Sequence, residues 1–215
     1  MQHNPPTLIL DLDGTISDPS LGITRSINYA LEQHDLPTVS DALAAKAIGP
    51  PLDHSFLKFA PKSSHDTITS LVGAYRERYA EVGYAENIVY PDIPGVLETL
   101  HSKGIRLGVC TSKRVDFAHQ ILALFDLTDY FDFVSGGEIG ISKGMQLAEL
   151  LEAETINEKA IMIGDRAVDI TAAHQNELHA VGVLWGFGDY AELSAESPWR
   201  ILKEVKELLQ LREIT

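Results

Sequence analysis

The sequence predicts an α/β fold in three layers, in which a mostly parallel β-sheet is covered by helices on both faces. Two observations lead to this prediction: short apolar runs recur along the chain without regular polar alternation, and stretches with helical spacing lie between them. Strands that are buried on both faces have this continuous apolar character. Their alternation with helices is typical of a parallel sheet.

Five apolar runs have the length of strands. They are residues 7–10, 105–110, 131–134, 160–163 and 180–184. Four sets of apolar residues between and after these runs have helical spacing. These sets are Val96, Leu97 and Leu100; Phe117, Ile121, Leu124 and Phe125; Leu147, Leu150 and Leu151; and Ile201, Leu202, Val205, Leu208 and Leu209. Gly104 follows the first set and suits the end of a helix.

Residues 17–87 contain no convincing strand and predict a helical insertion directly after the first strand. Two amphipathic helices are expected there. Their apolar positions are Ile23, Ile27, Ala30 and Leu31 in the first, and Ile68, Leu71, Val72, Tyr75, Tyr79 and Val82 in the second. Tyr75 and Tyr79 at this spacing are more typical of a core than of a substrate contact.

Composition narrows the class of partner. The chain of 215 residues has a formal net charge of -14 and a pI of about 4.9, which disfavours binding to nucleic acids or to anionic membrane surfaces. The single cysteine, Cys110, excludes an internal disulfide and lies in an apolar run, so we expect it to be buried and inert. No secretory signal and no apolar run of membrane-spanning length are visible, and we expect a soluble cytoplasmic protein.

Carboxylates gather where the predicted strands end. Residues 8–18 read LILDLDGTISD, so Asp11 and Asp13 follow the first strand, and GDRAVD after the fourth strand supplies Asp165 and Asp169. In a parallel α/β sheet, ligands bind beyond the carboxyl ends of the strands. Two carboxylates about 4 Å apart repel by roughly 4 kcal/mol at an effective dielectric constant of ~20. Their convergence therefore needs a cation.

Hydroxyl groups and lysines come to the same edge. Thr111, Ser112 and Lys113 follow the second strand, and Lys143 is the only lysine or arginine between Arg114 and Lys159. Mg²⁺ is usually held by one or two carboxylates together with water and substrate phosphate. A divalent cation and a lysine make such a site attractive for phosphate, and an aspartate can then act as nucleophile.

Four segments in this order, DLDGT, a threonine after the second strand, a lone lysine and GDRAVD, resemble the four motifs of the haloacid dehalogenase-like hydrolases. The resemblance extends from Leu8 to about Leu193. The insertion is similar to the helical cap of the phosphoglycolate phosphatase-like group, and IGPPL, YRERYAEVG and GVLWGFGDYAEL are similar to a branch described as 5′-nucleotidase-like. The resemblance implies a Rossmann-like core of residues 1–16 and 88–215 with a helical cap of residues 17–87.

The resemblance also implies roles for the residues of these motifs. Asp11 is the expected nucleophile, and Asp13 the general acid and then base. Thr111 is expected to hydrogen-bond the transferring phosphoryl group, and Lys143 to offset the charge of that group and of Asp11. The expected ligands of Mg²⁺ are Asp165, the Asp11 carboxylate and the main-chain oxygen of Asp13, with Asp169 orienting them from behind.

Further residues are expected to contact the substrate. They are Gly14, Thr15, Ser112, Lys113 and Gly49, of which Gly49 belongs to a stiff turn with two prolines and Ser112 acts mainly through its backbone. Structural interpretations stay open for several positions. Thr111 and Ser112 could cap the following helix, Lys143 could be a solvated surface lysine, and Asp169 could be a first-turn helix acid.

The leading functional prediction is a Mg²⁺-dependent phosphatase that cleaves small phosphate monoesters, of the phosphoglycolate or nucleoside 5′-monophosphate type, through an aspartyl-phosphate. The alternatives are a sugar phosphomutase that uses the same intermediate and a non-catalytic relative that binds a phosphorylated ligand. The expected partner is a small phosphorylated metabolite, with no nucleic acid and no membrane, and the expected state is a monomer or homodimer.

Overall fold

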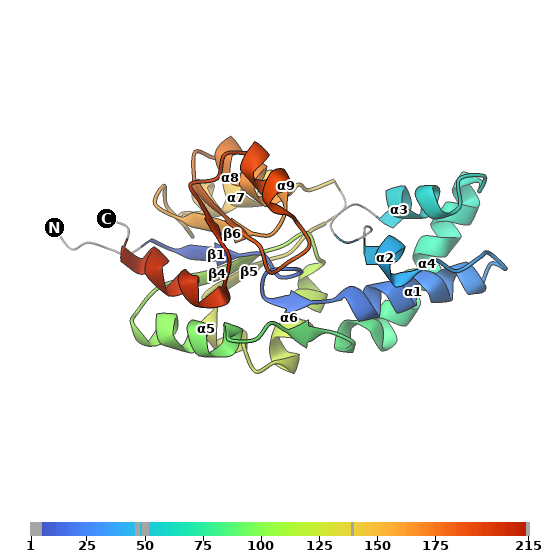
Figure 1. Cartoon of the computed structure of the whole chain (residues 1–215), viewed down its shortest axis with the longest axis horizontal. Coiled ribbons are helices and arrows are strands. Elements are labelled where there is room, and N and C mark those ends of the chain that lie inside the picture. Colours follow the sequence, from blue (N-terminus) through green and yellow to red (C-terminus); the bar gives the residue numbers. More distant parts are fainter. Residues whose placement is uncertain (1–5, 46–47, 49–51, 139, 214–215) are drawn as a thin grey trace. The chain divides into compact units, whose positions relative to one another are not determined.

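The computed structural model describes residues 6–45, 48, 52–138 and 140–213. The chain divides into two compact units, one formed by Met1–Ser17 together with Val89–Thr215, and the other by Asp18–Ile88. The first is an α/β unit and the second is helical (Figure 1). Each unit is described separately below.

A parallel sheet of six strands forms the centre of the described part of the α/β unit, in the order β5-β4-β1-β6-β7-β8. The strands are β1 (Leu8–Leu10), β4 (Leu107–Cys110), β5 (Phe133–Ser135), β6 (Ile161–Gly164), β7 (His179–Val183) and β8 (Arg200–Leu202). Leu8 of the central strand pairs with Leu107 on one side and with Ile161 on the other. Strands β1, β4 and β6 are buried throughout, which explains their continuous apolar character.

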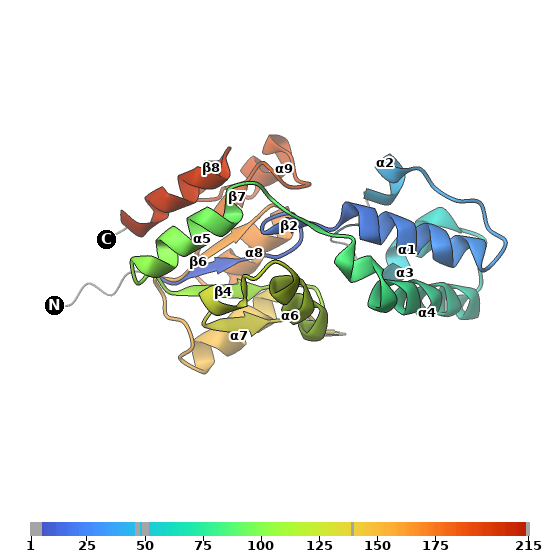
Figure 2. The ribbon, with the colours of Figure 1, turned by 90° about the horizontal axis from the view of Figure 1, so that it is seen from below.

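Helices cover both faces of this sheet, and the predicted α/β fold is confirmed. Helices α5 (Ile93–Ser102) and α6 (Val115–Leu124) lie on one face with the 3₁₀ segments η3 (Thr128–Tyr130) and η4 (Val205–Glu213). The other face carries α7 (Lys143–Glu152), α8 (Ala167–Gln175) and α9 (Tyr190–Ala195), as Figures 1 and 2 show. This division is the one that right-handed crossovers impose on the strand order.

The C-terminal part of the chain differs from its prediction. Ile201 and Leu202 lie in β8 rather than in a helix, because β8 pairs with β7 through contacts such as Gly182↔Ile201. The residues after them form the 3₁₀ helix η4. Pairing with the sheet therefore overrides the helical spacing of the apolar residues, which a strand followed by a short helix also satisfies.

The helical unit contains α1 (Ser20–Glu32), α2 (Asp41–Ala44), α3 (Leu52–Phe59), α4 (His65–Glu81) and the 3₁₀ turn η2 (Gly83–Ala85). In it α1 packs along α4 and η2 (Figure 2), and a Cβ atom on Gly22 would lie 2.0 Å from the carbonyl oxygen of Gly83. The rings of Tyr75 and Tyr79 are buried and stacked with centroids 5.5 Å apart, so they belong to the core as expected.

Two details of residues 17–87 differ from the expectation. A short strand, β2 (Ser17–Asp18), begins this segment and pairs with β3 (Ile88–Val89), which follows it. Val82 lies just beyond the end of α4 and is exposed, because the chain turns there into η2. Two-residue strands are too short to leave a pattern in a sequence.

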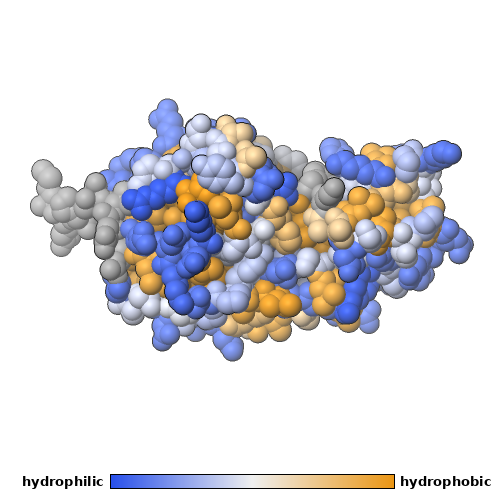
Figure 3. All heavy atoms as spheres, in the orientation of Figure 1, coloured by the Kyte–Doolittle hydropathy of each residue, from blue (hydrophilic) through white to orange (hydrophobic). Residues whose placement is uncertain are grey.

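The surface is mixed in character. On the face of the molecule in Figure 3, hydrophobic residues are interrupted by hydrophilic ones, which is ordinary for a surface in contact with water. Among the described residues, no helix combines the length and the apolarity that crossing a bilayer requires.

Candidate active site

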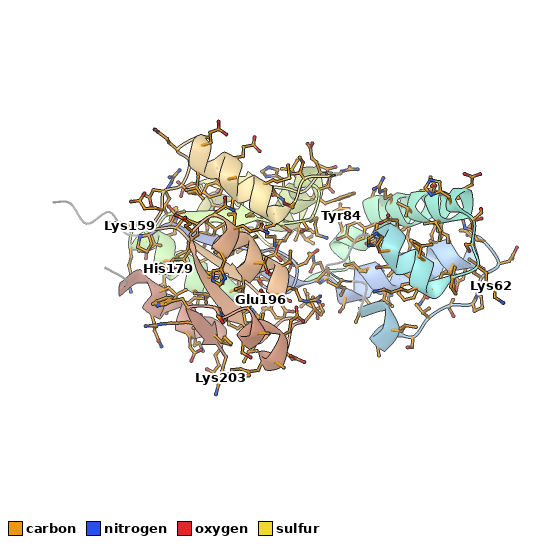
Figure 4. The ribbon with its side chains drawn as sticks, turned by 90° about the horizontal axis from the view of Figure 1, so that it is seen from above. Lys62, Tyr84, Lys159, His179, Glu196 and Lys203 are labelled. Atoms are coloured by element: carbon orange, nitrogen blue, oxygen red, sulfur yellow. The ribbon has the colours of Figure 1, made fainter. Side chains whose placement is uncertain are left out.

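The site lies at the carboxyl ends of three neighbouring strands. Asp11, Thr111 and Asp165 are the residues that directly follow β1, β4 and β6, and parallel pairing brings the ends of these strands to one edge of the sheet. Lys159 and His179, which are labelled in Figure 4, lie near the amino ends of β6 and β7. They mark the opposite edge.

Glycines let the loops approach Asp165 closely. Gly14 has a φ of +87°, and a Cβ atom there would lie 2.2 Å from Oδ2 of Asp165. A Cβ atom on Gly186, in the loop after β7, would lie 2.5 Å from the same oxygen. The glycine of DLDGT therefore permits both the left-handed backbone and the short distance between the first and fourth motifs.

Three buried carboxylates form the centre of the site. Asp11, Asp165 and Asp169 each offer an oxygen within 4.8 Å of those of the other two, and their exposed fractions are 8%, 0% and 1%. Burial, with the charges of Asp11 and Asp169, raises the pKa of Asp165 to about 8. Burial also raises the pKa of Asp169 to about 6, although Lys143 acts in the opposite direction. The cluster therefore favours an additional cation.

Lys143 is the buried cation of this cluster. It is the first residue of α7, whose start is capped by the Ser142 hydroxyl accepting from the Met145 N–H at 3.2 Å. The Lys143 Nζ lies 3.1 Å from Oδ1 of Asp11 and also pairs with Oδ1 of Asp169. Burial alone would lower its pKa, but these carboxylates outweigh it and raise the pKa, so the amine stays protonated. Lys143 is therefore not a solvated surface residue.

Asp13 is paired with a second lysine. Its Oδ2 lies 2.8 Å from Nζ of Lys113, and burial raises its pKa while Lys113 opposes that shift. A raised pKa suits a group that must donate a proton. The pairing of Lys113 with Asp13 was not foreseen from the sequence, which placed Lys113 only among the expected substrate contacts.

Two carboxylate oxygens lack a hydrogen-bond partner among the described residues. They are Oδ1 of Asp13 and Oδ1 of Asp165, both buried, whereas Oδ2 of Asp165 accepts from the Phe187 N–H at 2.7 Å. A buried polar atom without a partner is costly, and carboxylate oxygens are the ligands that hard divalent cations prefer. The donor set around Asp165 therefore fits a divalent metal ion.

Asp169 is held in a fixed orientation. Its Oδ2 accepts from the Arg166 N–H at 3.0 Å, while its Oδ1 faces Lys143. Asp169 thus is both an acid in the first turn of α8 and a member of the charged cluster, so the two interpretations of this residue are compatible.

The loop after β4 carries Thr111, Ser112 and Lys113. Thr111 is 2% exposed; its N–H donates to the Ser135 carbonyl at 3.0 Å, and its hydroxyl accepts from the Lys113 N–H at 3.2 Å. The Ser112 side chain is exposed. The Thr111 hydroxyl stabilises the loop rather than capping α6, which begins only at Val115.

Another expected contact, Thr15, belongs to the loop after β1. Thr15 is buried, and its carbonyl accepts from Nε1 of Trp185 at 3.0 Å. Trp185 thus connects the loop after β7 with the loop after β1. Gly49 lies outside the described residues.

Two residues that support the site were missed from the sequence. Glu192 of α9 accepts from Nε of Arg166 at 2.8 Å and from the Ala167 N–H at 2.9 Å, at the start of the helix that carries Asp169. Gln146 of α7 is buried and bonds to the loop after β4. Of these two, only Gln146 could have been recognised in the sequence, because it is a polar residue on the buried side of an amphipathic helix.

This arrangement defines a class of protein, an α/β enzyme with an aspartate next to a buried lysine and a buried carboxylate cluster whose oxygens fit a divalent metal ion. The model of a protein family described as "Haloacid dehalogenase-like hydrolase" matches residues 8–183 of the chain. The chain belongs to this family, as its motifs predicted, and it is a phosphoric monoester hydrolase.

The chain is similar to two named enzymes and to a hydrolase of solved structure. A 5′-nucleotidase of Pseudomonas aeruginosa is 35% identical over 97% of this chain and 96% of its own length. A phosphoglycolate phosphatase of Aquifex aeolicus is 30% identical over 96% of both chains. A haloacid dehalogenase-like family hydrolase from Streptococcus pneumoniae has a solved structure that matches with a TM-score of 0.88 at 28% identity, covering 96% of this chain and 98% of that one.

Proposed function

We propose that this protein is a Mg²⁺-dependent phosphatase that hydrolyses small phosphate monoesters through an aspartyl-phosphate. The observation that carries the proposal is the position of the Asp11 carboxylate, 3.1 Å from the buried amine of Lys143 and within 4.8 Å of Asp165 and Asp169. A carboxylate next to fixed positive charge can approach an anionic phosphoryl group, which it would otherwise repel.

The first step is attack by an Asp11 oxygen on phosphorus. The bond from phosphorus to the ester oxygen breaks, and Asp13 gives that oxygen its proton. Asp13 suits this role because burial raises its pKa. In the second step Asp13 takes a proton from water, which attacks phosphorus, so that inorganic phosphate leaves and the Asp11 carboxylate is restored.

The other groups hold the phosphoryl group and offset its charge. Lys143 neutralises the charge that Asp11 and phosphate bring together, and the loop after β4 offers the Thr111 hydroxyl and the Ser112 backbone. Gly14, Thr15 and Lys113 are further proposed contacts of the substrate.

The acidic cluster is the proposed magnesium site. Asp11, Asp165 and the Asp13 carbonyl oxygen would bind Mg²⁺, and Asp169 would orient them through its bonds to Lys143 and the Arg166 N–H. Bound Mg²⁺ supplies charge stabilisation for the transferring phosphoryl group. The unpartnered Oδ1 of Asp165 supports this assignment.

The helical unit is proposed to act as a cap that selects the substrate and excludes water during the first step. The candidate substrates are phosphoglycolate and nucleoside 5′-monophosphates, the types suggested by the names of the relatives. The net charge of -14 supports a small metabolite, rather than a nucleic acid or a membrane, as the partner. The proposal includes a cytoplasmic location and a monomeric or dimeric state.

A panel of phosphate esters tests this function. Inorganic phosphate release is measured for phosphoglycolate, nucleoside 5′-monophosphates, sugar phosphates and p-nitrophenyl phosphate, each with Mg²⁺ or with EDTA, and esters are ranked by kcat/KM. We expect phosphate release with Mg²⁺ and none with EDTA. Conversion of one sugar phosphate into an isomer without phosphate release would favour the phosphomutase, and ligand binding without any turnover would favour the non-catalytic relative.

A further inference from the structure

We propose that Gln146 is a positioning residue that fixes the phosphate-binding loop after β4 relative to the helix that carries Lys143. This inference rests on the proposed function, because only there do Thr111 and Lys143 bind the phosphoryl group. Gln146 itself lies outside the four motifs. Gln146 touches neither substrate nor metal in the proposed mechanism. It acts through Thr111.

The side chain of Gln146 is buried, with 2% of the residue exposed, and it is bonded at both ends of its amide. The Nε2 group donates to the Thr111 carbonyl at 3.2 Å. The Oε1 atom accepts from the Ser135 hydroxyl at 2.8 Å and from the Cys110 thiol at 3.7 Å. One amide therefore connects α7 with β4, with β5 and with the first residue of the loop after β4.

These bonds fix the peptide groups on both sides of Thr111. Its N–H donates to the Ser135 carbonyl at 3.0 Å, and its carbonyl accepts from Gln146. With both groups held, the position of the Thr111 hydroxyl follows from the position of α7 and β5. Displacement of a group that positions a substrate by about 1 Å can cost 10²-fold in rate.

Gln146 is also placed to couple this loop with Lys143. The two residues are three positions apart on α7, so they lie on the same face of the helix, and both are buried. The Gln146 N–H donates to the Ser142 carbonyl at 3.0 Å, within the turn that carries Lys143. One helical turn and one amide therefore connect the backbone that carries Lys143 with the backbone that carries Thr111.

A set of three variants separates positioning from stability. Gln146→Met keeps an unbranched side chain of similar size without hydrogen bonds, and it leaves the Ser135 hydroxyl without its partner. Ser135→Ala removes that hydroxyl alone. The double variant removes both partners, which is often nearly neutral for stability, but it still lacks the bond to Thr111. Glu149→Gln, at an exposed position of the same helix, is the matched control.

The measurements are kcat and KM for p-nitrophenyl phosphate at saturating Mg²⁺, the Kd of inorganic phosphate by calorimetry, and Tm. We expect Gln146→Met to lower kcat/KM about tenfold, to weaken phosphate binding and to lower Tm. In the double variant we expect Tm to recover only in part, because the Thr111 carbonyl still lacks its partner, while the full loss of kcat/KM and of phosphate affinity remains. Ser135→Ala and Glu149→Gln stay within about twofold of the wild type in kcat/KM.

Recovery of kcat/KM together with Tm in the double variant would overturn the inference, and so would a kcat/KM in Gln146→Met within twofold of the wild type. If Gln146→Met does not fold, the double variant alone decides between these outcomes. Failure of the proposed function is recognised separately, because the wild-type protein would then release no phosphate from any ester of the panel.

Discussion

Lys143 shows how a single residue determines the charge balance of the site. Its amine pairs with Asp11 and with Asp169, which without it would be buried carboxylates close to one another. Breaking a buried ion pair by removing one partner is strongly destabilising, whereas the complete pair is tolerated. The lysine therefore supports both the fold and the proposed chemistry of Asp11.

Asp11→Asn is expected to abolish phosphate release while the protein stays folded. The change removes the nucleophilic charge with almost no change in volume. The fold tolerates it because Lys143 keeps its pair with Asp169 and because repulsion with Asp165 and Asp169 is relieved. Phosphate release and Tm are measured for this variant and for Asp129→Asn, an exposed control that should behave like the wild type. Turnover above a trace of the wild-type rate in Asp11→Asn would rule out the covalent mechanism.

Asp165→Asn is expected to raise the Mg²⁺ concentration for half-maximal activity, by roughly 10-fold or more. The reason is that Asp165 is fully buried and has an oxygen without a partner, as a metal ligand would. The readouts are a Mg²⁺ titration of phosphate release and a calorimetric titration of Mg²⁺ alone, with Asp129→Asn as control. Unchanged titration curves would remove Asp165 from the proposed metal site.

At the scale of the elements, the sequence predicted best the strands whose burial is complete. The runs that became β1, β4 and β6 were found because both faces are covered, whereas β8 was missed because it is an edge strand of three residues with mixed burial. The helices α1 and α4 were found from the apolar side that each buries. The spacing of apolar residues in a sequence reflects which positions are buried. Short strands at the edge of a sheet have few buried positions and are therefore hard to recognise.

The same limit applies to the site. Asp11 and Asp165 were recognised because they are carboxylates that directly follow apolar runs, and Lys143 because it is the only lysine or arginine between Arg114 and Lys159. Neither observation needs any knowledge of contacts. The pairs of Lys113 with Asp13 and of Gln146 with Thr111 join segments far apart in the chain, so no local pattern announces them. Their discovery depended on the sheet order that brings those segments together.

An ion pair joins the elements of the helical unit and gives a test by pH. Arg78 of α4 donates to both Glu86 oxygens, at 2.9 and 3.1 Å, and Arg25 of α1 donates to one of them at 2.6 Å. Arg78 and Arg25 therefore share one carboxylate and connect α4 with α1. The hydrogen bond from Arg78 is the main reason that the pKa of Glu86 lies below its ordinary value of 4.5.

Glu86→Gln is expected to destabilise the full chain by about 1 kcal/mol at pH 7. Because the folded state lowers the pKa of Glu86, the ion pair stabilises the protein above the unfolded pKa, and that stabilisation is lost as the pH falls through the folded pKa. Denaturant unfolding at pH 7 and at steps below 4.5 measures the difference, with the exposed Glu77→Gln as control. A difference that did not shrink on acidification would contradict this account.

At the scale of the whole molecule, the proposed chemistry and the proposed substrate choice belong to different compact units. The catalytic aspartates and Lys143 lie in the α/β unit, and the segment Asp18–Ile88 forms the helical unit. A reaction on the phosphoryl group alone needs only the first. Preference among esters is then expected to depend on the second.

Exchange of residues 48–52 for the matching loop of a relative with another substrate tests this division. Relative kcat/KM values among natural esters are expected to shift, while the rate on p-nitrophenyl phosphate changes much less, because this small ester offers little for a selecting loop to contact. Exchange of residues 61–64, which lead into α4, for a loop of equal length is the control. An equal loss of rate on every ester would identify the loop as structural.

The position of β1 has a consequence for the order in which the chain folds. This strand is made first, yet its neighbours in the sheet are β4 and β6, which follow the complete helical unit. At about 5–20 residues per second, roughly 8–30 s of synthesis separate β1 from β6. The contacts of the helical unit are closer in sequence and can form during that interval. We therefore expect Asp11 to meet Asp165 late, because the side of β1 that pairs with β6 stays unpaired until β6 has been made.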